Sequence, residues 1–246
     1  MLKIVVPYRG REEHLDLFKK LTPLAYPMLL KTYDIKIIIV EQANEKKFNI
    51  SKLINIGYKL FSPYNICDCS NDNCKKSDSF IFWPVDHWFV GGFSGLQSSK
   101  NKIKLFWPDM DYRINILMNY FSFNNYMTLG YKGFSCCPLL FNNVGGQPEE
   151  LKYSCGEDNL FTYKIIKTVG RENVIIHPVK CIHDSENILV GESPHWKHTV
   201  PEENITDWEI EADKKSWKNN LENLEFDVLE NNTYDNVISH VKVNWK

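Results

Sequence analysis

Apolar and polar residues alternate along the first third of the chain in a way that predicts strands separated by helices. Three short apolar runs, at 3–6, 35–40 and 79–82, are rich in branched or aromatic side chains and predict buried strands. Apolar residues recur at helical spacing in 11–30 and 50–61, which predicts two helices between them. A strand–helix–strand–helix–strand order favours a parallel sheet with helices on its faces.

The rest of the chain continues this α/β pattern. An amphipathic helix is expected at 157–169, ended by Gly170. The polar segment 191–213 is expected to form a loop with a short helix. Further strands are expected at 102–107, 114–123, 173–176, 226–229 and 237–243, the last two as an antiparallel pair. Because we see neither an internal repeat nor a linker, residues 1–246 are expected to form a single domain.

Composition narrows the class of protein. The 246 residues are 43% hydrophobic and 24% charged, the balance of a water-soluble globular domain. With a formal net charge of −2 and no dominant run of Lys or Arg, the sequence argues against a nucleic-acid partner. It has no stretch of about 20 apolar residues and no recognisable signal peptide, so a cytoplasmic location is expected. A lumenal location is expected only if the chain is a trimmed part of a longer protein.

Two arginines follow the first predicted strand directly. Ligands of open α/β sheets bind beyond the carboxyl ends of the strands, where Arg9 and Arg11 would lie. Their guanidinium groups could hold a diphosphate through paired hydrogen bonds. A solvated loop with ion pairs to Glu12 and Glu13 explains the same residues, and taken alone it is the simpler interpretation.

Carboxylates follow two of the other predicted strands. Asp86 comes just after the strand at 79–82, and a carboxylate there can bind Mn²⁺ or Mg²⁺ bridging two phosphates. Asp109 and Asp111 form a D-x-D pair after the strand at 102–107. Either position could be only a solvated turn.

Two further groups suggest catalysis and metal binding. Glu157 and Asp158 follow Gly156 at the start of a predicted helix. Acidic residues there are favoured by the helix dipole alone, but Asp158 could also act as a general base toward a hydroxyl. His183 follows another strand and could complete a metal shell, with Cys181 on the same side of an extended backbone.

These pieces occur in one order, and in that order the sequence resembles the β-1,4-galactosyltransferase family (glycosyltransferase family 7). VPYRGREEHL at 6–15 is close to the family's P-F/Y-R-x-R-x-x-H-L opening, and FNISKLINIG at 48–57 resembles its F-N-R-A-K-L-L-N-V-G helix. GEDN at 156–159 matches the end of its W-G-W-G-x-E-D-D core. Shorter matches are EQA at 41–43, MNYFSF at 118–123, GFS at 133–135 and LEFDVL at 224–229.

The resemblance implies a divergent member of viral or microbial type with a GT-A fold, a Rossmann-like, mixed but mostly parallel sheet flanked by helices. It implies an inverting hexosyltransferase that moves galactose or a related sugar from a UDP-sugar to a glycan or other hydroxyl acceptor, assisted by Mn²⁺ or Mg²⁺. By position, Asp158 resembles the general base and Glu157 the carboxylate that holds the sugars. Asp86 and His183 resemble the metal ligands, with Cys181 and Asp111 as weaker candidates. The positions that resemble nucleotide-sugar contacts are Pro7, Tyr8, Arg9, Arg11, Phe48, Val85, Asp86 and Gly156.

The sequence also departs from the family pattern. Pro84 stands where the first acid of the metal motif is expected, and Ile50 replaces the Arg of F-N-R. Residues 152–155 replace the W-G-W-G platform for the acceptor. Cys181 is a soft ligand that suits zinc better than Mn²⁺. These losses motivate an alternative, a degenerate member that binds a nucleotide sugar or glycan without catalysis. A third possibility is an interaction protein in which Glu157 and Asp158 only cap a helix.

Overall fold

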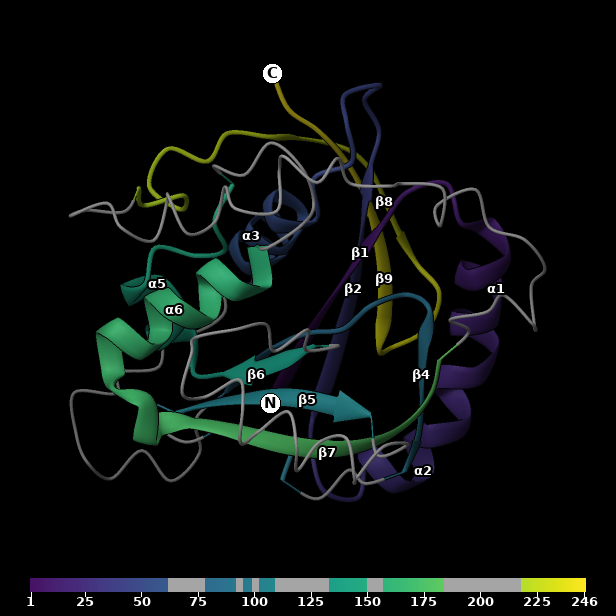
Figure 1. Cartoon of the computed structure of the whole chain (residues 1–246). Helices are drawn as coiled ribbons and strands as arrows, with labels where there is room; N and C mark the ends of the chain where they lie inside the picture. The colour runs from purple at the N-terminus through teal and green to yellow at the C-terminus, as the bar shows by residue number, and fades with distance from the viewer. Residues whose placement is uncertain (62–77, 92–94, 99–101, 109–132, 150–156, 184–217) are drawn as a thin grey trace.

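The computed structural model describes residues 1–61, 78–91, 95–98, 102–108, 133–149, 157–183 and 218–246 (Figure 1). The strands are β1 (Leu2–Tyr8), β2 (Ile35–Gln42), β3 (Ser79–Phe82), β4 (His87–Gly91), β5 (Ile103–Pro108), β6 (Phe134–Cys136), β7 (Val174–His183), β8 (Asp227–Thr233) and β9 (Ile238–Asn244). The helices are α1 (Glu12–Leu21), α2 (Tyr26–Leu29), α3 (Ile50–Phe61), α5 (Pro138–Asn143) and α6 (Glu157–Val169), with 3₁₀ turns η1 (Thr22–Ala25) and η3 (Arg171–Asn173).

In the described part of the chain the strands join in one mixed sheet, in the order β4-β7-β5-β6-β3-β1-β2-β9-β8. β1 is parallel to both of its neighbours, with Tyr8 opposite Glu41 of β2 and Val5 opposite Phe82 of β3. β9 is parallel to β2, whereas β8 returns antiparallel to β9. β6 is antiparallel to β3 and β5, so most of the described strands run in one direction and end at the same edge.

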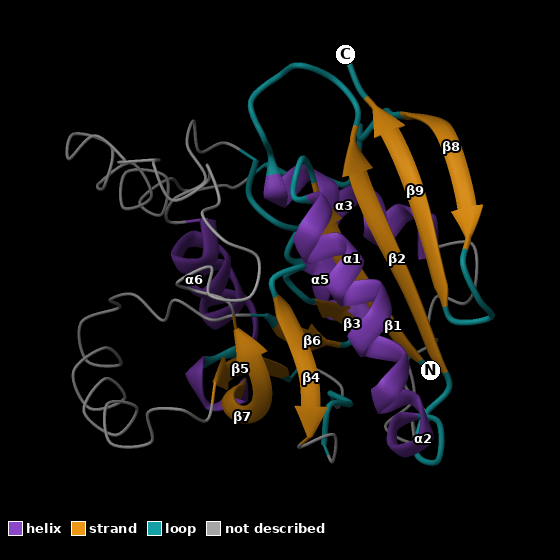
Figure 2. Cartoon of the chain, turned by 90° about the vertical axis from the view of Figure 1, so that its right-hand side faces the viewer, coloured by secondary structure: helices purple, strands orange, loops and turns teal. Residues whose placement is uncertain are grey.

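The helices cover the two faces of the sheet (Figures 1 and 2). Leu15 and Phe18 of α1 pack with Leu2, Ile4, Val6 and Tyr8 of β1, whereas Val5 faces the other core with α3, α5 and α6. This division follows from the period-two alternation of a strand buried on both sides. α3 lies so close to β1 that a Cβ on Gly57 would stand 2.4 Å from Cγ1 of Val5, which explains a glycine inside this helix.

β7 connects two parts of the sheet. Its residues 174–179 pair with β5 in parallel, and its residues 180–183 pair with β4 in antiparallel fashion. β4 in turn lies against α1, where the rings of Trp88 and His14 stack with centroids 6.3 Å apart. This arrangement brings the segment just before β4 next to the amino end of α1.

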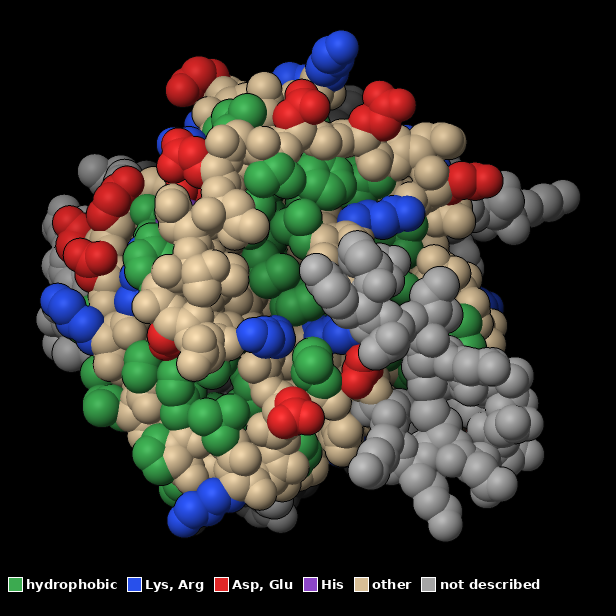
Figure 3. Space-filling view, turned by 180° about the vertical axis from the view of Figure 1, so that it is seen from behind, with side chains coloured by type: hydrophobic (Ala, Val, Ile, Leu, Met, Phe, Trp, Pro, Cys, Tyr) green, Lys and Arg blue, Asp and Glu red, His purple; other side chains and the backbone are tan. Residues whose placement is uncertain are grey.

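The surface agrees with the near-neutral charge of the sequence. Acidic and basic side chains are interspersed over the described part of the face seen from behind (Figure 3). Among the described residues, no helix has the length and apolar character needed to cross a membrane.

Most of the predicted elements in the described ranges are confirmed, including α3, α6 and the antiparallel pair β8–β9. The single helix predicted for 11–30 is wrong, because it breaks into α1, η1 and α2 where Pro23 and Pro27 interrupt the backbone hydrogen bonds. The short elements β4, β6 and α5 were not predicted. β7 continues past the strand predicted at 173–176. The segments 114–123 and 191–213 lie outside the described residues.

Asp78 forms a partly buried ion pair that supports a stability prediction. Its carboxylate lies 2.9 Å from Nζ of buried Lys3 and 3.0 Å from the amino group of Met1. Burial raises the pKa of Asp78, but hydrogen bonds and charge attraction from these two amines outweigh it and hold the pKa below its ordinary value. The ionised carboxylate therefore stabilises the fold above about pH 4, and this stabilisation is lost as the pH falls through the lowered pKa.

We expect Asp78→Asn to lower the free energy of unfolding by roughly 1–3 kcal/mol at neutral pH, because Lys3 would keep its buried charge without a carboxylate. Urea unfolding of both proteins at pH 7 and at about pH 3 measures the difference. It should shrink at the acidic pH. A difference that stays constant between the two pH values would contradict this account.

Candidate functional site

The carboxyl ends of β1, β2 and β3 bring three of the predicted segments to one edge of the sheet. Residues 7–11 include the end of β1 and the turn after it, the loop 43–49 follows β2, and residues 84–86 follow β3. They meet there because parallel neighbours in register must end at the same edge. The residues that follow these three strands therefore lie at one edge of the sheet.

Arg11 and Asp86 form the ion pair at the centre of this edge. Nη1 of Arg11 donates to Oδ2 of Asp86 at 2.9 Å, with the side chains 24% and 13% exposed. The other carboxylate oxygen lies 3.0 Å from Nδ1 of His87. Nε1 of Trp83 donates to the carbonyl of His87 at 2.9 Å, which holds this turn against the core. A cation and a carboxylate are therefore fixed together in a partly buried position.

The pairing of β4 with β7 brings the predicted metal residues to the same place. His183 is the register partner of His87, one residue from Asp86, and Cys181 is the partner of Phe89. Asp109 and Asp111 lie outside the described residues, as does Gly156. Within the described ranges no group of three or more His, Cys, Asp or Glu side chains is gathered around a common metal position. The support for a joint role of Asp86 and His183 is therefore the strand register, which brings their backbones close together.

Gln42 and Arg9 hold the loop 43–49. The side chain of Gln42 is buried, and its Nε2 donates to Oδ1 of Asn44 at 2.9 Å and to the carbonyls of Lys46 and Lys47 at 2.8 and 3.1 Å. Its Oε1 accepts from the backbone N–H of Asn49 at 3.1 Å. Nη1 of Arg9 also donates to the carbonyl of Lys46. The two arginines predicted to act together thus have different partners, Arg9 on this loop and Arg11 on Asp86.

The remaining nucleotide-contact candidates are packed into or against the protein core. Pro7, Tyr8 and Val85 are buried, and Phe48 is half-buried against the core on the α3 side of the sheet. Burial raises the pKa of Tyr8, and the nearby charges of Glu12 and Glu41 raise it further, so this phenol stays neutral at physiological pH.

His240 of β9 is a neighbour of the site that the sequence analysis missed. Its ring meets the edge of Tyr8 with centroids 5.8 Å apart, and its Nε2 lies 2.7 Å from Oε2 of Glu41. Burial lowers the pKa of His240, although the charge of Glu41 opposes this. No local signal marks it, because it reaches the edge only through the long-range pairing of β9 with β2.

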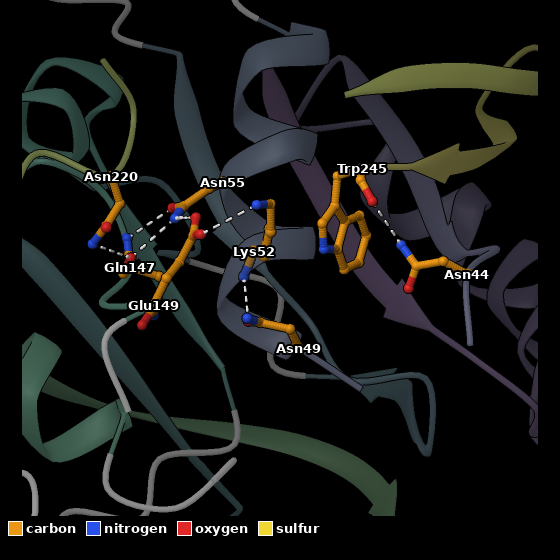
Figure 4. Close-up of polar contacts among 8 residues, drawn as sticks. All are labelled: Asn44, Asn49, Lys52, Asn55, Gln147, Glu149, Asn220 and Trp245. Carbon is orange, nitrogen blue, oxygen red and sulfur yellow. Dashed lines mark hydrogen bonds and ion pairs between the residues drawn. The ribbon is translucent and has the colours of Figure 1, made fainter. Parts of the chain in front are cut away.

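A second polar group missed from the sequence joins α3 to the segment that precedes α6 (Figure 4). Asn55 has no exposed surface, and its Nδ2 donates to the carbonyl of Gln147 at 3.0 Å and to Oε1 of Glu149 at 2.7 Å. Its Oδ1 accepts from the backbone N–H of Gln147 at 2.8 Å. A polar residue in the apolar face of α3 was the available sequence signal for this group.

Glu157 and Asp158 occupy the first turn of α6. The helix is held by core residues one turn further on, Leu160, Phe161 and Ile165. The backbone is therefore placed as predicted, and it is compatible with a base as well as with a helix cap.

The amino-terminal third of the chain matches a family model. Residues 1–87 match the model described as the N-terminal region of glycosyl transferase group 7. Over 84 residues the chain is 38% identical to beta-1,4-galactosyltransferase 4 of Homo sapiens and 36% identical to that of Cricetulus griseus. Each match covers 34% of this chain and 21% of the relative. The chain therefore spans about a fifth of the length of the curated relatives it matches.

The fold extends the likeness to the whole chain. The catalytic domain of Drosophila beta1,4galactosyltransferase 7, solved with xylobiose, superposes with a TM-score of 0.65 at 14% identity, covering 100% of this chain and 94% of that one. A variant of the same enzyme, solved with manganese, UDP-Gal and xylobiose, gives a TM-score of 0.64 with the same coverage. The predicted GT-A class of α/β fold is confirmed.

The hydrogen bonds of Gln42 generate a prediction about the loop. Gln42→Glu should lower the free energy of unfolding by roughly 1–3 kcal/mol, because carboxylate oxygens would face the carbonyls that now accept from Nε2. Hydrogen exchange at 44–49 should accelerate with it. Gln97→Glu, at a half-exposed glutamine between β4 and β5, is the matched control and should change little. Equal exchange at 44–49 in all three proteins would show that Gln42 does not hold the loop.

Proposed function

We propose, from the match of residues 1–87 to the N-terminal region of group 7 glycosyl transferases, that the chain moves a hexose from a UDP-sugar to a hydroxyl acceptor. The observation that carries the proposal is the meeting of Arg11 and Asp86 at the carboxyl edge of the sheet, with His183 in register one residue away. The GT-A fold over the whole chain supports the same activity. Residues 1–246 would act as a single domain.

The donor nucleotide would bind at the edge formed by β1, β2 and β3. Pro7, Tyr8, Phe48 and Val85 would line its base and ribose. Arg9 and Arg11 would face the diphosphate, whose negative charge suits guanidinium donors. Because Arg11 is already held by Asp86, little side-chain entropy would be lost when phosphate oxygens join the pair.

A divalent cation would sit beside this diphosphate. Asp86 supplies a carboxylate oxygen that suits Mn²⁺ or Mg²⁺, and His183 on β7 pairs in register with His87, the residue next to Asp86, so these residue types would suit such a cation. When bound, the ion would neutralise charge on the departing UDP. Cys181 would be a weaker ligand, and Asp111 would replace Asp86 if the D-x-D pair is the metal motif. Pro84 contributes no carboxylate, so the protein would hold the ion with fewer acids than the family pattern expects.

The reaction itself is a single displacement. The acceptor oxygen forms a bond to the anomeric carbon while the bond from that carbon to the β-phosphate oxygen breaks, and the bonding electrons leave with UDP. Asp158 takes the proton of the acceptor hydroxyl, and Glu157 orients the sugars by hydrogen bonds. Gly156 would leave room for the donor sugar beside them. Attack opposite to the leaving group inverts the configuration at the anomeric carbon.

A degenerate member that binds a nucleotide sugar or glycan without turnover is the second candidate. Pro84 in the metal segment and the altered residues 152–155 favour it. The two functions differ in one measurable product, since only the enzyme releases UDP.

For the base, we predict that Asp158→Asn lowers UDP release in the presence of acceptor by at least about a hundredfold, because general base catalysis contributes on the order of 10²–10⁴. Binding of the UDP-sugar, followed by calorimetry, should stay within a few-fold of wild type. Asp227→Asn, at an exposed acid on β8, is the control and should keep full activity. Wild-type turnover by Asp158→Asn would exclude this residue as the base.

For the metal, we predict that UDP release from a panel of UDP-sugars requires Mn²⁺ or Mg²⁺. Asp86→Asn should raise the Mn²⁺ concentration for half-maximal activity at least about tenfold, since an amide is a weaker ligand than a carboxylate. Asp111→Asn is the matched comparison. If only Asp111→Asn raises that concentration, the D-x-D pair is the metal motif and Asp86 is not a ligand.

A further inference from the structure

The buried amide of Asn55 links α3 to the chain just before the candidate base. We propose that Asn55 is a positioning residue: by fixing Gln147 and Glu149, it restrains the position of α6, where Asp158 lies. This inference rests on the proposed function for its catalytic consequence, but the anchoring role stands on the contacts alone.

The contact between Asn55 and Gln147 is a paired one. The amide oxygen accepts from the backbone N–H of Gln147 at 2.8 Å, and the amide nitrogen donates to the carbonyl of the same residue at 3.0 Å. Asn220 adds a third hydrogen bond, from its Nδ2 to that carbonyl at 3.1 Å. A side chain that satisfies both backbone groups of one residue fixes its orientation as well as its position.

The glycines before Gln147 allow this close approach. Gly145 and Gly146 both have φ of +76°, a region that favours glycine. A Cβ on Gly146 would stand 2.6 Å from Oδ1 of Asn55. The turn thus presents the backbone of Gln147 to Asn55 at a distance that a side chain at 146 would prevent.

Glu149 extends the anchor toward α6. Its Oε1 accepts from Nδ2 of Asn55 at 2.7 Å, and its Oε2 lies 3.8 Å from Nζ of Lys52, one turn earlier in α3. Only residues 150–156 separate Glu149 from Glu157, the first residue of α6. Val144, just before the anchored turn, and Phe161 of α6 belong to one buried cluster, so a displacement of the turn would disturb the core that supports α6.

α3 also connects this anchor with the donor edge. Asn49 accepts from the backbone N–H of Lys52 at 2.9 Å at the start of the helix, and its own N–H donates to Gln42. α3 itself is fixed on β1 by the close packing at Gly57. The helix is consequently a rigid connection between the loop at 43–49 and the segment that leads to Asp158, and loss of Asn55 should disturb only the second of these.

Hydrogen exchange tests the anchor without any assay of activity. In Asn55→Ala, the hydrogen-bonded amides of α6 from Phe161 onward and those at 145–149 should exchange at least tenfold faster, whereas β1, β2 and the loop at 43–49 should be unchanged. Glu149→Gln keeps an oxygen for Asn55 and should have a smaller effect. Asp78→Asn is the control for a general loss of stability, because Asp78 lies just before the start of β3 and the donor edge lies at its other end. Unchanged exchange in α6 of Asn55→Ala would overturn the proposal.

The ratio of sugar transfer to hydrolysis of the UDP-sugar tests the catalytic consequence. Misplacement of the base should slow transfer to a hydroxyl acceptor by at least tenfold relative to hydrolysis by water, with the KM for the donor unchanged. A merely structural role would lower both rates together, as expected for Asp78→Asn, and would overturn the positioning role. If the wild-type chain releases no UDP at all, the proposed function fails, while faster exchange confined to α6 and 145–149 would still support the anchor.

Discussion

The parallel pairing of β1 with β2 and β3 is the constraint on which the rest of the structure depends. This pairing requires the chain to leave all three strands at one edge of the sheet. Gln42 lies at the end of β2, and Arg11 and Asp86 lie just beyond the ends of β1 and β3. The core formed on both faces of β1 makes this register costly to change, because a shift by one residue would exchange the two sets of buried side chains. The packing of the apolar side chains therefore determines where these polar groups lie.

Two polar systems are built on this sheet, and α3 lies between them. At the donor edge, Arg11 with Asp86 and Gln42 with its loop are held by hydrogen bonds and ion pairs in partly buried positions. On the side of α6, Asn55 holds the backbone of Gln147. Prearranged donors and carboxylates of this kind lose little on binding a charged ligand, because their own reorganisation is already complete. We therefore expect changes at Gln42 or Asn55 to accelerate hydrogen exchange mainly in the segments that these side chains hold.

The sequence predicted the elements that carry a strong apolar period, and it missed those that tertiary packing creates. β1 could be found from its continuous run of apolar residues, and α3 and α6 from apolar residues at helical spacing. β4 and β6 are short strands whose only reason to be extended is the neighbour they pair with. For the site, the order of Arg11, Asp86 and Asp158 was visible in the sequence. His240 was not, because its place beside Tyr8 follows from the pairing of β9 with β2, which joins Ile39 to His240 across the length of the chain. Asn55 could be noticed as a polar residue on an apolar helix face, but its partners at 147 and 149 could not.

Calorimetric titration with UDP tests the central claim most directly, because nucleotide binding at the donor edge is required by the enzyme and by the degenerate member alike. The account predicts saturable binding of one UDP per chain in the presence of Mn²⁺, weakened at least about tenfold in Arg11→Met and favoured over CDP and GDP. Absence of binding by the wild-type chain, or equal binding by Arg11→Met, would contradict the assignment of this edge as a nucleotide-sugar site.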